Sequence, residues 1–411
     1  MKKIIFQIVS CITVCMFLFM GSQSCWAMVD SFVWTNPTAV EASSSIESNS
    51  NNQQANLALE SEAAILMDQG SGQVLFEKDA HKQLRPASVT KVMTILLIME
   101  ALDSGKITYD TQIPCSENAA SMGGSQIWLD VREELSVNDM LKAICVVSAN
   151  DCTVAMAEYL AGSQEAFVEQ MNQKAKELGM QDTTFKNCHG IDEDGHVTSA
   201  YDIALMSREL LTKHPAITKY TTIWMDSLRD GKSGLVNTNK LVRNYPGATG
   251  LKTGSTSLAL YNLSASATRD GLSLIAVIMR APNSDTRFKD AKKVLDYGFS
   301  NYTYKQLAKE GDKVQQVEVQ KGVESTVDAI FEADSGKLLK KGEMKNIEQK
   351  IELREPFVAP IEKGEILGTA IFTDSSGQES RVNLIASQSI AKISLWNMTT
   401  HLYQMWFQLL R

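Results

Sequence analysis

The pattern of hydrophobic and polar positions predicts two short strands followed by a buried helix. Residues 63–68 and 73–77 are mostly apolar, and the stretch between them contains two glycines and a serine, which is typical of a hairpin turn. A longer apolar run, 92–102, follows Pro86. Because proline is tolerated ahead of a helix or in its first turn, this run predicts a buried helix that ends near 103–105.

Helical spacing dominates the middle of the chain. A helix is expected to begin at Ser136, whose side chain is suited to capping, and residues 148–151 interrupt it. Apolar residues near helical spacing predict three more helices, at 152–160, 163–178 and 201–212. Together these segments predict a mainly helical block.

Strands return near Gly250. An alternating stretch at 261–267 and an apolar run at 272–279 predict two strands, and 290–299 predicts a closing helix. Strands, then helices, then strands on one chain predict an α/β (α+β) domain with an antiparallel sheet and helices on its faces. We place this domain at 58–304.

After about Tyr304 the chain changes to short apolar stretches separated by Gly-containing turns. Residues 314–319, 326–330 and 351–353 predict short strands. We therefore expect a small all-β domain at 305–385. The domain carries no catalytic combination of residues, so its expected role is that of a spacer or docking module.

The N-terminal segment has the composition of an export signal. Two lysines precede an almost entirely apolar stretch, 4–20, and small residues at the cleavage-determining positions lead up to Ala27. We expect a signal peptide at 1–27, with an uncleaved anchor as the alternative. Residues 28–57 are rich in Ser, Asn, Gln and Ala and predict a flexible leader.

The C-terminal residues, 386–411, predict an amphipathic helix. Its second face is too polar for a helix that spans a bilayer, so we expect it to lie flat in a membrane interface. A helix that packs in a dimer or against a domain is the alternative. The apolar face carries Leu395, Met398, Leu402, Met405, Trp406 and Leu409.

Composition and charge narrow the classes of function. The 411 residues are 44% hydrophobic, enough for real cores, and the net charge of -8 argues against nucleic-acid binding. The chain has no His/Cys cluster with zinc spacing and no Gly-rich phosphate loop, so we expect neither a metal nor a cofactor.

The cysteines that remain after the signal peptide form two disulfides or stay as buried free thiols, and the sequence leaves both possibilities open. They are Cys115, Cys145, Cys152 and Cys188.

Ser88 and Lys91 lie three residues apart at the start of the first predicted helix. This spacing puts both side chains on one face, one turn apart, where an amine can take a proton from a hydroxyl. The helix N-terminus adds unpaired backbone N–H groups and a partial positive charge. These features suit a serine nucleophile and its base, whereas a capping serine beside a solvated lysine is the structural alternative. Ser389 and Lys392 have the same spacing, and we give that match no meaning.

Two triplets strengthen the interpretation of Ser88 as a nucleophile. Ser148-Ala149-Asn150 lies where two predicted helices meet, so a short turn can push its hydroxyl and amide into a cleft. Lys252-Thr253-Gly254 precedes an expected strand, and its glycine lets another backbone or a ligand approach closely. The same patterns occur at Ser116-Glu117-Asn118 and Lys232-Ser233-Gly234, but order and spacing along the chain select the first pair.

The Ser-x-x-Lys tetrad and the two triplets together resemble the penicillin-binding, active-site-serine family. Within it, residues 185–192, 195–196, 199–202 and 245–254 are similar to the low-molecular-mass D-alanyl-D-alanine carboxypeptidases. The resemblance covers about 57–304 and implies a penicillin-binding/β-lactamase-like catalytic fold. The all-β domain and the amphipathic tail match the layout of the same family more loosely.

The resemblance implies the catalytic roles. Ser88 would attack the carbonyl between the two terminal D-alanines of a peptidoglycan stem peptide, with Lys91 as the base for acylation. Ser148 and Lys252 would form a second proton path toward the leaving group, and Asn150 would orient the substrate and the lysine. An acyl-enzyme forms, D-alanine leaves, and water releases the shortened peptide.

The resemblance also implies the substrate-binding residues. The backbone N–H groups of Ser88 and Ser255 would form the oxyanion hole. Thr253 and the adjacent Gly254 would help to hold the terminal carboxylate, and Arg287 would add a positive charge there. Relatives often carry His or Tyr where this chain has Ser255, which is expected to affect rate or substrate preference but not the reaction class.

Two rival functions remain. A class A β-lactamase shares the three motifs, but it usually has Asp where this chain has Ala149, together with a separate deacylating Glu. A catalytically inactive cell-wall binding module is the other rival, and the intact motifs argue against it. Slow release of bound penicillin favours the carboxypeptidase, fast turnover favours the β-lactamase, and no acylation favours the binding module.

The expected partners follow from this reading. They are peptidoglycan stem peptides as substrates, β-lactam antibiotics as covalent inhibitors, and a membrane surface that the tail would contact. The expected location is the outer face of the bacterial cytoplasmic membrane, after export. The sequence does not separate carboxypeptidase action from endopeptidase action on cross-links.

Overall fold

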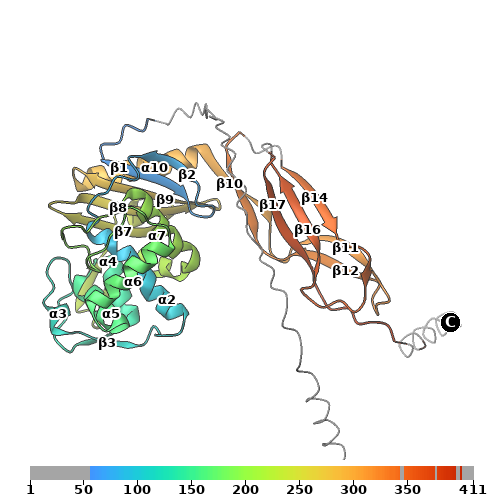
Figure 1. The fold of residues 1–411 in the computed structure, drawn as a ribbon, viewed down its shortest axis with the longest axis horizontal. Helices are drawn as coiled ribbons and strands as arrows, with labels where there is room; N and C mark the ends of the chain where they lie inside the picture. Colours follow the sequence, from blue (N-terminus) through green and yellow to red (C-terminus); the bar gives the residue numbers. More distant parts are fainter. Residues whose placement is uncertain (1–55, 343–346, 375–376, 395–398, 400–411) are drawn as a thin grey trace, which may run out of the picture. The chain divides into compact units, whose positions relative to one another are not determined.

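A computed structural model describes residues 56–342, 347–374, 377–394 and 399 (Figure 1). The predicted signal peptide, almost all of the predicted leader and most of the predicted tail helix lie outside these residues. In the part of the chain that is described, no helix is long and apolar enough to cross a membrane.

A five-stranded antiparallel sheet forms the centre of the first domain, with the order β2-β1-β9-β8-β7. The N-terminal hairpin pairs with a strand from the other end of the domain, because Ala63 lies opposite Met279 and Asp68 opposite Leu274. The predicted antiparallel sheet is confirmed. Its strands are β1 (Ala63–Asp68), β2 (Val74–Lys78), β7 (Ala248–Thr256), β8 (Leu260–Arg269) and β9 (Leu272–Ala281).

The sheet separates two hydrophobic cores. Along β1, Ile65 and Met67 belong to the core shared with the helical block, whereas Ala64 and Leu66 belong to the core under α10 (Ser284–Asn301). A strand covered on both faces is apolar at successive positions, which explains the unbroken run. Helix α10 begins six residues before the predicted start, where the Asn283 side chain accepts a hydrogen bond from the Thr286 N–H.

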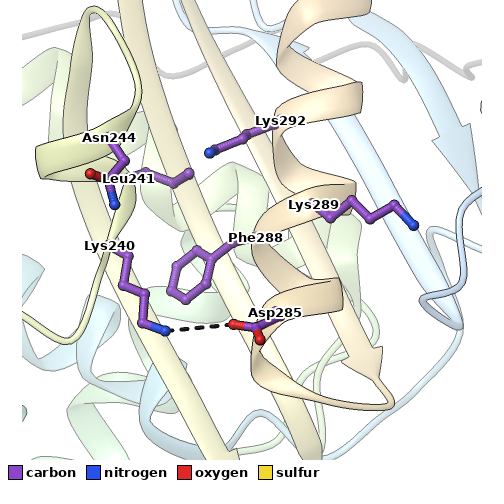
Figure 2. A pocket seen from close by; sticks show the side chains of 7 residues that line it. All are labelled: Lys240, Leu241, Asn244, Asp285, Phe288, Lys289 and Lys292. Atoms are coloured by element: carbon purple, nitrogen blue, oxygen red, sulfur yellow. Dashed lines mark ion pairs between the residues drawn. The ribbon is translucent and has the colours of Figure 1, made fainter.

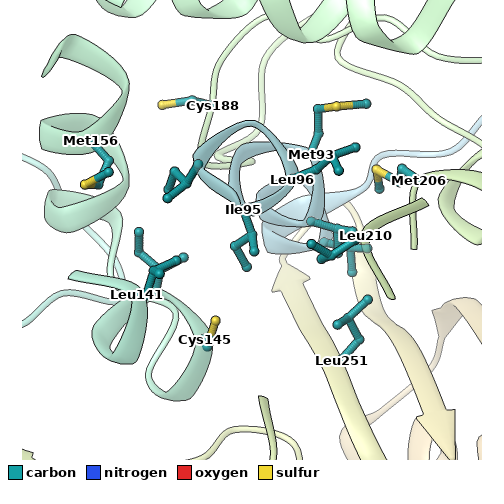
Figure 3. Close-up of a cluster of buried hydrophobic side chains, with 14 of the residues drawn as sticks. Met93, Ile95, Leu96, Leu141, Cys145, Met156, Cys188, Met206, Leu210 and Leu251 are labelled. Carbon is teal, nitrogen blue, oxygen red and sulfur yellow. The ribbon is translucent and has the colours of Figure 1, made fainter. Parts of the chain in front are cut away.

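The helical block surrounds α2 (Lys91–Asp103), whose residues from Lys91 to Leu96 are all buried. A helix that is hydrophobic on all sides belongs inside a domain. Figure 3 shows Ile95 and Leu96 among side chains of neighbouring elements, including Leu141, Met156, Leu210 and Leu251. The surrounding helices are α4 (Val137–Val146), α5 (Asn150–Ala161), α6 (Gln164–Glu177) and α7 (Ala200–Lys213).

Serine side chains cap several of these helices. The hydroxyl groups of Ser136, Ser163 and Ser199 accept hydrogen bonds from backbone N–H groups in the first turns of α4, α6 and α7. The remaining short elements of this domain are η1 (Ala87–Thr90), η2 (Pro215–Ile217), α3 (Glu117–Ala120), α8 (Thr218–Thr221), α9 (Leu241–Asn244), β3 (Gln112–Pro114), β4 (Glu134–Ser136), β5 (Met225–Leu228) and β6 (Ser233–Val236).

The residues after α10 form an all-β unit with its own core, as predicted. β10 (Tyr302–Ala308) pairs with β13 (Ser335–Lys340), and a second sheet has the order β14-β16-β17-β12-β11-β15. Sequence analysis did not predict β16 and β17. The second sheet contains β11 (Lys313–Gln320), β12 (Thr326–Phe331), β14 (Glu348–Leu353), β15 (Phe357–Val358), β16 (Ile366–Thr373) and β17 (Glu379–Ala386).

The all-β unit extends beyond the expected boundary at residue 385. Ile390 is 2% exposed, and its backbone exchanges two hydrogen bonds with Ile361. Residues 386–393 therefore pack with the unit and do not begin a separate helix. Ser389 and Lys392 lie in this non-helical stretch, so their helix-like spacing does not place them on one face. The predicted tail helix beyond residue 394 lies almost entirely outside the described residues.

Candidate active site

Ser88 lies in the short 3-10 helix η1, directly before α2, and Lys91 is the first residue of α2. Pro86 occupies the position that precedes η1, where its missing N–H is not needed. The Lys91 Nζ and Ser88 Oγ atoms are 3.0 Å apart. The structure thus brings the two predicted residues into direct contact, although a 3-10 turn and not an α-helix carries the serine.

Lys91 is fully buried and has three hydrogen-bond partners. Besides Ser88, its Nζ donates to Asn150 Oδ1 at 2.6 Å and to the backbone oxygen of His189 at 2.7 Å. Burial lowers the pKa of Lys91 well below its usual range, and the charge of Lys252 lowers it further. A neutral amine has two N–H groups and one lone pair. When the amine is neutral, its two N–H groups are taken by the two pure acceptors, and its lone pair is left for the Ser88 hydroxyl.

Asn150 is held in one orientation by its other contacts. Its Nδ2 donates to the Gly123 oxygen at 2.7 Å, and its backbone N–H donates to the Ser125 oxygen at 2.7 Å. Because the amide nitrogen is engaged with a carbonyl, the amide oxygen must face Lys91. The orientation predicted for Asn150 toward the lysine is therefore built into the loop that contains Gly123.

Ser148 lies at the junction of α4 and α5, in the left-handed region of backbone conformation with φ 65. Its side chain is buried, and its Oγ has no hydrogen-bond partner among the described residues. A buried hydroxyl without a partner and a strained backbone both cost free energy, and such features concentrate at functional sites. The short turn predicted at this triplet is present.

Lys252 lies on β7 and is 1% exposed. Burial lowers its pKa to about 7, with a smaller contribution in the same direction from Arg287. Its Nζ donates to the backbone oxygen of Thr253 at 2.9 Å, and the Thr253 hydroxyl lies 2.7 Å from that of Thr238. Lys252 and Lys91 are close enough for the charge of one to lower the pKa of the other.

The alternative triplets lie elsewhere. Lys232 is exposed in the turn between β5 and β6. Ser116 caps α3, and its hydroxyl donates to Glu158 Oε2 at 2.6 Å. Neither triplet contacts Ser88 or Lys91 in the described part of the chain.

Gly254 brings β7 against the start of the nucleophile helix. A Cβ atom at this position would lie 2.8 Å from the backbone nitrogen of Ser88 and 2.9 Å from the oxygen of Pro86. Ser255 follows with an exposed side chain and pairs with Tyr261 on β8. The β7 strand, which would supply the second oxyanion donor, thus runs beside the Ser88 backbone N–H, which would be the first donor.

Arg287 is buried on α10 and bonds to the strands of the site. Its Nη1 donates to the backbone oxygens of Gly254 at 3.2 Å and Asn262 at 3.1 Å, while its Nε has no partner among the described residues. Burial lowers its pKa to about 10. A cation therefore lies directly beside the Lys-Thr-Gly strand.

Several residues that build this site were given no role in it by the sequence, although His189 and Gly190 lie in the family-like stretch 185–192. His189 contributes only its main-chain oxygen, which no residue type could reveal. A Cβ on Gly190 would lie 1.9 Å from the Ala87 oxygen, so glycine is required beside η1. Asn262 is fully buried, and its Nδ2 donates to the oxygens of Arg85 at 2.8 Å and Pro86 at 3.0 Å. A polar amide near the start of an alternating strand was the available signal for Asn262.

No carboxylate hydrogen-bonds to Ser88 or Lys91 among the residues that the structure describes. Asp151, next to Asn150, uses its oxygens on backbone N–H groups of Ile127, Leu129 and Cys152. A deacylating Glu of the β-lactamase type is therefore not found in contact with the described nucleophile.

The four cysteines that sequence analysis left open are free and buried. Burial raises the pKa of the Cys145 and Cys188 thiols to about 12. Raised pKa values make these thiols poor nucleophiles, so the described cysteines act as packing residues and not as a rival active site.

A separate pocket lies between α9 and α10 (Figure 2). The Lys240 Nζ lies 5.9 Å from the centre of the Phe288 ring and 3.5 Å from Asp285 Oδ1. The pocket contains none of the predicted site residues. It is lined by Lys240, Leu241, Asn244, Asp285, Phe288, Lys289 and Lys292.

Two family profiles match the chain. One is described as D-alanyl-D-alanine carboxypeptidase and matches residues 48–283, and the other is the C-terminal domain of penicillin-binding protein 5 and matches residues 302–392. The D-alanyl-D-alanine carboxypeptidase DacF of Bacillus subtilis is 46% identical over 77% of this chain and 82% of that relative. DacC of Escherichia coli is 32% identical over 90% of this chain and 93% of that relative.

Solved structures agree with the family profiles. Penicillin-binding protein 5 from Haemophilus influenzae is 30% identical, with a TM-score of 0.63, over 81% of this chain and 98% of that one. Penicillin-binding protein D2 from Listeria monocytogenes, solved in an ampicillin-bound form, is 32% identical, with a TM-score of 0.55, over 60% of this chain and 100% of that one. With the Ser88–Lys91 contact, these matches show that the chain belongs to the D-alanyl-D-alanine carboxypeptidase family of penicillin-binding proteins.

Proposed function

We propose that this chain is a serine carboxypeptidase that removes the terminal D-alanine from peptidoglycan stem pentapeptides through an acyl-enzyme. The observation that carries the proposal is the hydrogen bonding of the buried Lys91 amine. Asn150 Oδ1 and the His189 oxygen engage its N–H groups, which leaves its lone pair for the Ser88 hydroxyl. A neutral amine in contact with a hydroxyl is the arrangement that general-base activation of serine needs.

In acylation, the Ser88 hydroxyl gives its proton to Lys91, and its Oγ bonds to the carbonyl carbon between the two D-alanines. The backbone N–H groups of Ser88 and Ser255 are the proposed donors to the oxyanion, which the approach of β7 at Gly254 supports. Collapse of the intermediate breaks the C–N bond, and the leaving nitrogen takes up a proton. Water then attacks the acyl carbon, which frees the shortened peptide and returns a proton to Ser88.

Ser148 and Lys252 are the proposed proton path to the leaving nitrogen. The Ser148 Oγ is buried and has no hydrogen-bond partner in the described part of the chain, which supports its availability to a bound substrate. The pKa of Lys252 is lowered to about 7, so both of its protonation states are populated near neutral pH. A group with a pKa near the working pH is best suited to both accept and donate a proton.

The terminal carboxylate of the substrate is proposed to bind beside β7. The Thr253 hydroxyl, paired with Thr238, would donate to it, and Gly254 would leave room for it. Arg287 holds the Gly254 oxygen and keeps a positive charge next to the strand. This charge would favour substrates that end in a free carboxylate and β-lactams that carry one in the same place.

The proposal extends to the location of the protein. Export with cleavage after Ala27, and association of the tail beyond about residue 394 with the outer face of the cytoplasmic membrane, both rest on the sequence pattern alone. The packed position of Ile390 supports an anchor that begins only after about residue 394. The catalytic domain at 58–304 and the all-β domain that follows it complete the proposed layout.

The proposal is tested with the chain from residue 28 onward and a stem pentapeptide that ends in D-Ala-D-Ala. We expect release of free D-alanine and, after penicillin treatment, an intact mass increased by one penicillin. Both should be absent in Ser88→Ala. Labelling of Ser88→Ala at the wild-type rate would exclude Ser88 as the nucleophile. Fast turnover of penicillin would favour a β-lactamase, and a wild-type chain that is never acylated would favour a binding module.

A further inference from the structure

Arg229 binds a loop that lies more than ninety positions away along the sequence. The loop comprises residues 123–133, between α3 and β4, and is called the 123–133 loop below. Arg229 lies at the tip of the hairpin formed by β5 and β6, and its side chain is 23% exposed. It is not part of any motif recognised in the sequence.

All five N–H groups of the Arg229 guanidinium have partners. Its Nε and Nη2 donate to the two carboxylate oxygens of Glu133 at 2.6 and 2.8 Å. Its Nη1 donates to the backbone oxygen of Ile127 at 2.9 Å and to Ser233 Oγ at 3.0 Å, and its Nη2 also donates to the oxygen of Trp128 at 3.1 Å. A bidentate pair that also binds two main-chain carbonyls fixes the position of the loop, and lysine cannot reproduce it.

The opposite side of the 123–133 loop binds the start of α5. The oxygen of Ser125 accepts from the Asn150 backbone N–H, and the oxygen of Gly123 accepts from Asn150 Nδ2, both at 2.7 Å. The N–H groups of Ile127 and Leu129 donate to Asp151 Oδ2 at 3.0 and 3.1 Å. The loop is thus held between Arg229 on one side and Asn150 on the other.

The orientation of the Asn150 amide depends on this loop. While the Gly123 oxygen binds Nδ2, the Oδ1 atom faces Lys91 and accepts one of its N–H groups at 2.6 Å. If the loop shifted, the amide could turn and present Nδ2, a donor, to an amine that is also donating. The Lys91 lone pair would then no longer be directed reliably at Ser88.

We propose that Arg229 is a positioning residue for acylation, acting through the 123–133 loop to hold the Asn150 amide toward Lys91. The inference rests on the proposed acylation of Ser88 and goes beyond it, because Arg229 touches no reacting atom. A residue that served stability alone would lower the amount of folded enzyme without changing the acylation rate constant of the folded fraction.

The test measures acylation by a fluorescent penicillin over a range of concentrations, which separates the first-order acylation rate constant from the initial binding constant. We expect Arg229→Ala to lower the rate constant by roughly 10–100-fold, the size of effect that follows small misplacement of a reacting group, with little change in initial binding. Arg229→Lys keeps the charge, and its acylation rate constant should lie between those of the wild type and Arg229→Ala.

Arg208→Ala is the matched control. Arg208 also binds two backbone carbonyls of a turn, donating to Gln69 at 3.0 Å and to Gly70 at 2.6 Å, but that turn does not contact the site. The acylation rate constant of Arg208→Ala should equal that of the wild type. Equal losses in Arg208→Ala and Arg229→Ala would overturn the proposal in favour of general destabilisation.

A double-mutant cycle tests whether Arg229 acts through Asn150. If it does, adding Arg229→Ala to Asn150→Ala causes little further loss of the acylation rate constant, whereas additive losses contradict the proposal.

Hydrogen exchange of residues 123–133 provides a readout that needs no acylation. It should rise in Arg229→Lys and Arg229→Ala, and unchanged protection would also overturn the proposal. Absence of labelling in the wild type would instead refute the proposed function.

Discussion

Gly254 faces the backbone nitrogen of Ser88 so closely that a Cβ atom on Gly254 would lie 2.8 Å from it. The same Cβ would lie 2.8 Å from the nitrogen of Val89 and 2.9 Å from the oxygen of Pro86. All three neighbours are main-chain atoms, which cannot rotate away as a side chain can. The strand that carries the Lys-Thr-Gly triplet therefore packs backbone to backbone against the start of the nucleophile helix.

This packing predicts a strong effect of Gly254→Ala. The extra methyl must push β7 away from η1, and overpacking of this kind costs about 1–3 kcal/mol. We expect a lower free energy of unfolding and penicillin acylation reduced by at least about 10-fold, measured by chemical denaturation and by fluorescent labelling. Gly234→Ala is the control, because a Cβ there has no atom within 4 Å. Similar effects in both variants would show that the close approach at Gly254 is unimportant.

The two Lys-x-Gly triplets provide a second comparison. Lys252 is buried beside Lys91, whereas Lys232 is exposed in a hairpin turn. We expect Lys252→Ala to reduce acylation by both peptide and penicillin by about 10²–10³-fold, as removal of a preorganised charge does, and Lys232→Ala to be near silent. Intact mass against time after penicillin addition measures both. Equal losses would mean that the wrong triplet was assigned to the site.

Burial of Lys252 should make the protein less stable at neutral pH than it would be with an apolar residue. The folded-state pKa of about 7 lies below the ordinary value of 10.5, so the unfolded chain binds more protons between these values. The loss of folding free energy caused by the buried Lys252 is therefore largest below pH 7 and disappears as the pH rises toward 10.5.

We accordingly expect Lys252→Met to raise the melting temperature at pH 6.5 by at least about 2–4 °C, although it slows acylation as Lys252→Ala does. The difference from the wild type should shrink steadily when calorimetry is repeated up to pH 10. A difference that stays constant, or that grows with pH, would contradict the assigned direction of the pKa shift. Lys232→Met, at an exposed position, should show no such difference.

The C-terminal boundary predicts different outcomes for two truncations. A chain that ends at residue 394 keeps the pairing of Ile390 with Ile361, so it should fold, react with penicillin at the wild-type rate and no longer sediment with lipid vesicles. A chain that ends at residue 385 loses the last residue of β17 and the buried Ile390 side chain, which should cost about 2–5 kcal/mol in the all-β unit.

Vesicle co-sedimentation at low and high salt, with thermal unfolding of the same samples, measures both effects. Sedimentation of the chain that ends at residue 394, at the full-length level, would place the membrane contact elsewhere. Equal stability of the two truncated chains would show that residues 386–394 contribute nothing to the all-β unit.

Local sequence features were sufficient for much of the fold. The cap-like Ser136, the position of Pro86 and helical spacing located the longer helices, because these signals depend on residues a few positions apart. The first residues of longer elements were harder to predict from the sequence. Helix α10 begins at Ser284 because Asn283 caps it, but its first turn is polar and lacks the apolar spacing that marked 290–299.

The residue types and their order along the chain were enough to indicate the chemistry and the family. The sequence placed Ser88 and Lys91 one turn apart because helical geometry acts over three or four positions. Three features became visible only in the folded chain. The His189 carbonyl accepts a hydrogen bond from Lys91, Lys252 is buried whereas Lys232 is exposed, and Arg229 binds the 123–133 loop. Main-chain groups carry no residue identity, and burial is created by segments far apart in the chain. The orientation of Asn150 could therefore not be obtained before the chain was folded. The sequence motifs suggested that the charge of Lys252 lowers the pKa of Lys91, but not that burial is the larger cause for both lysines.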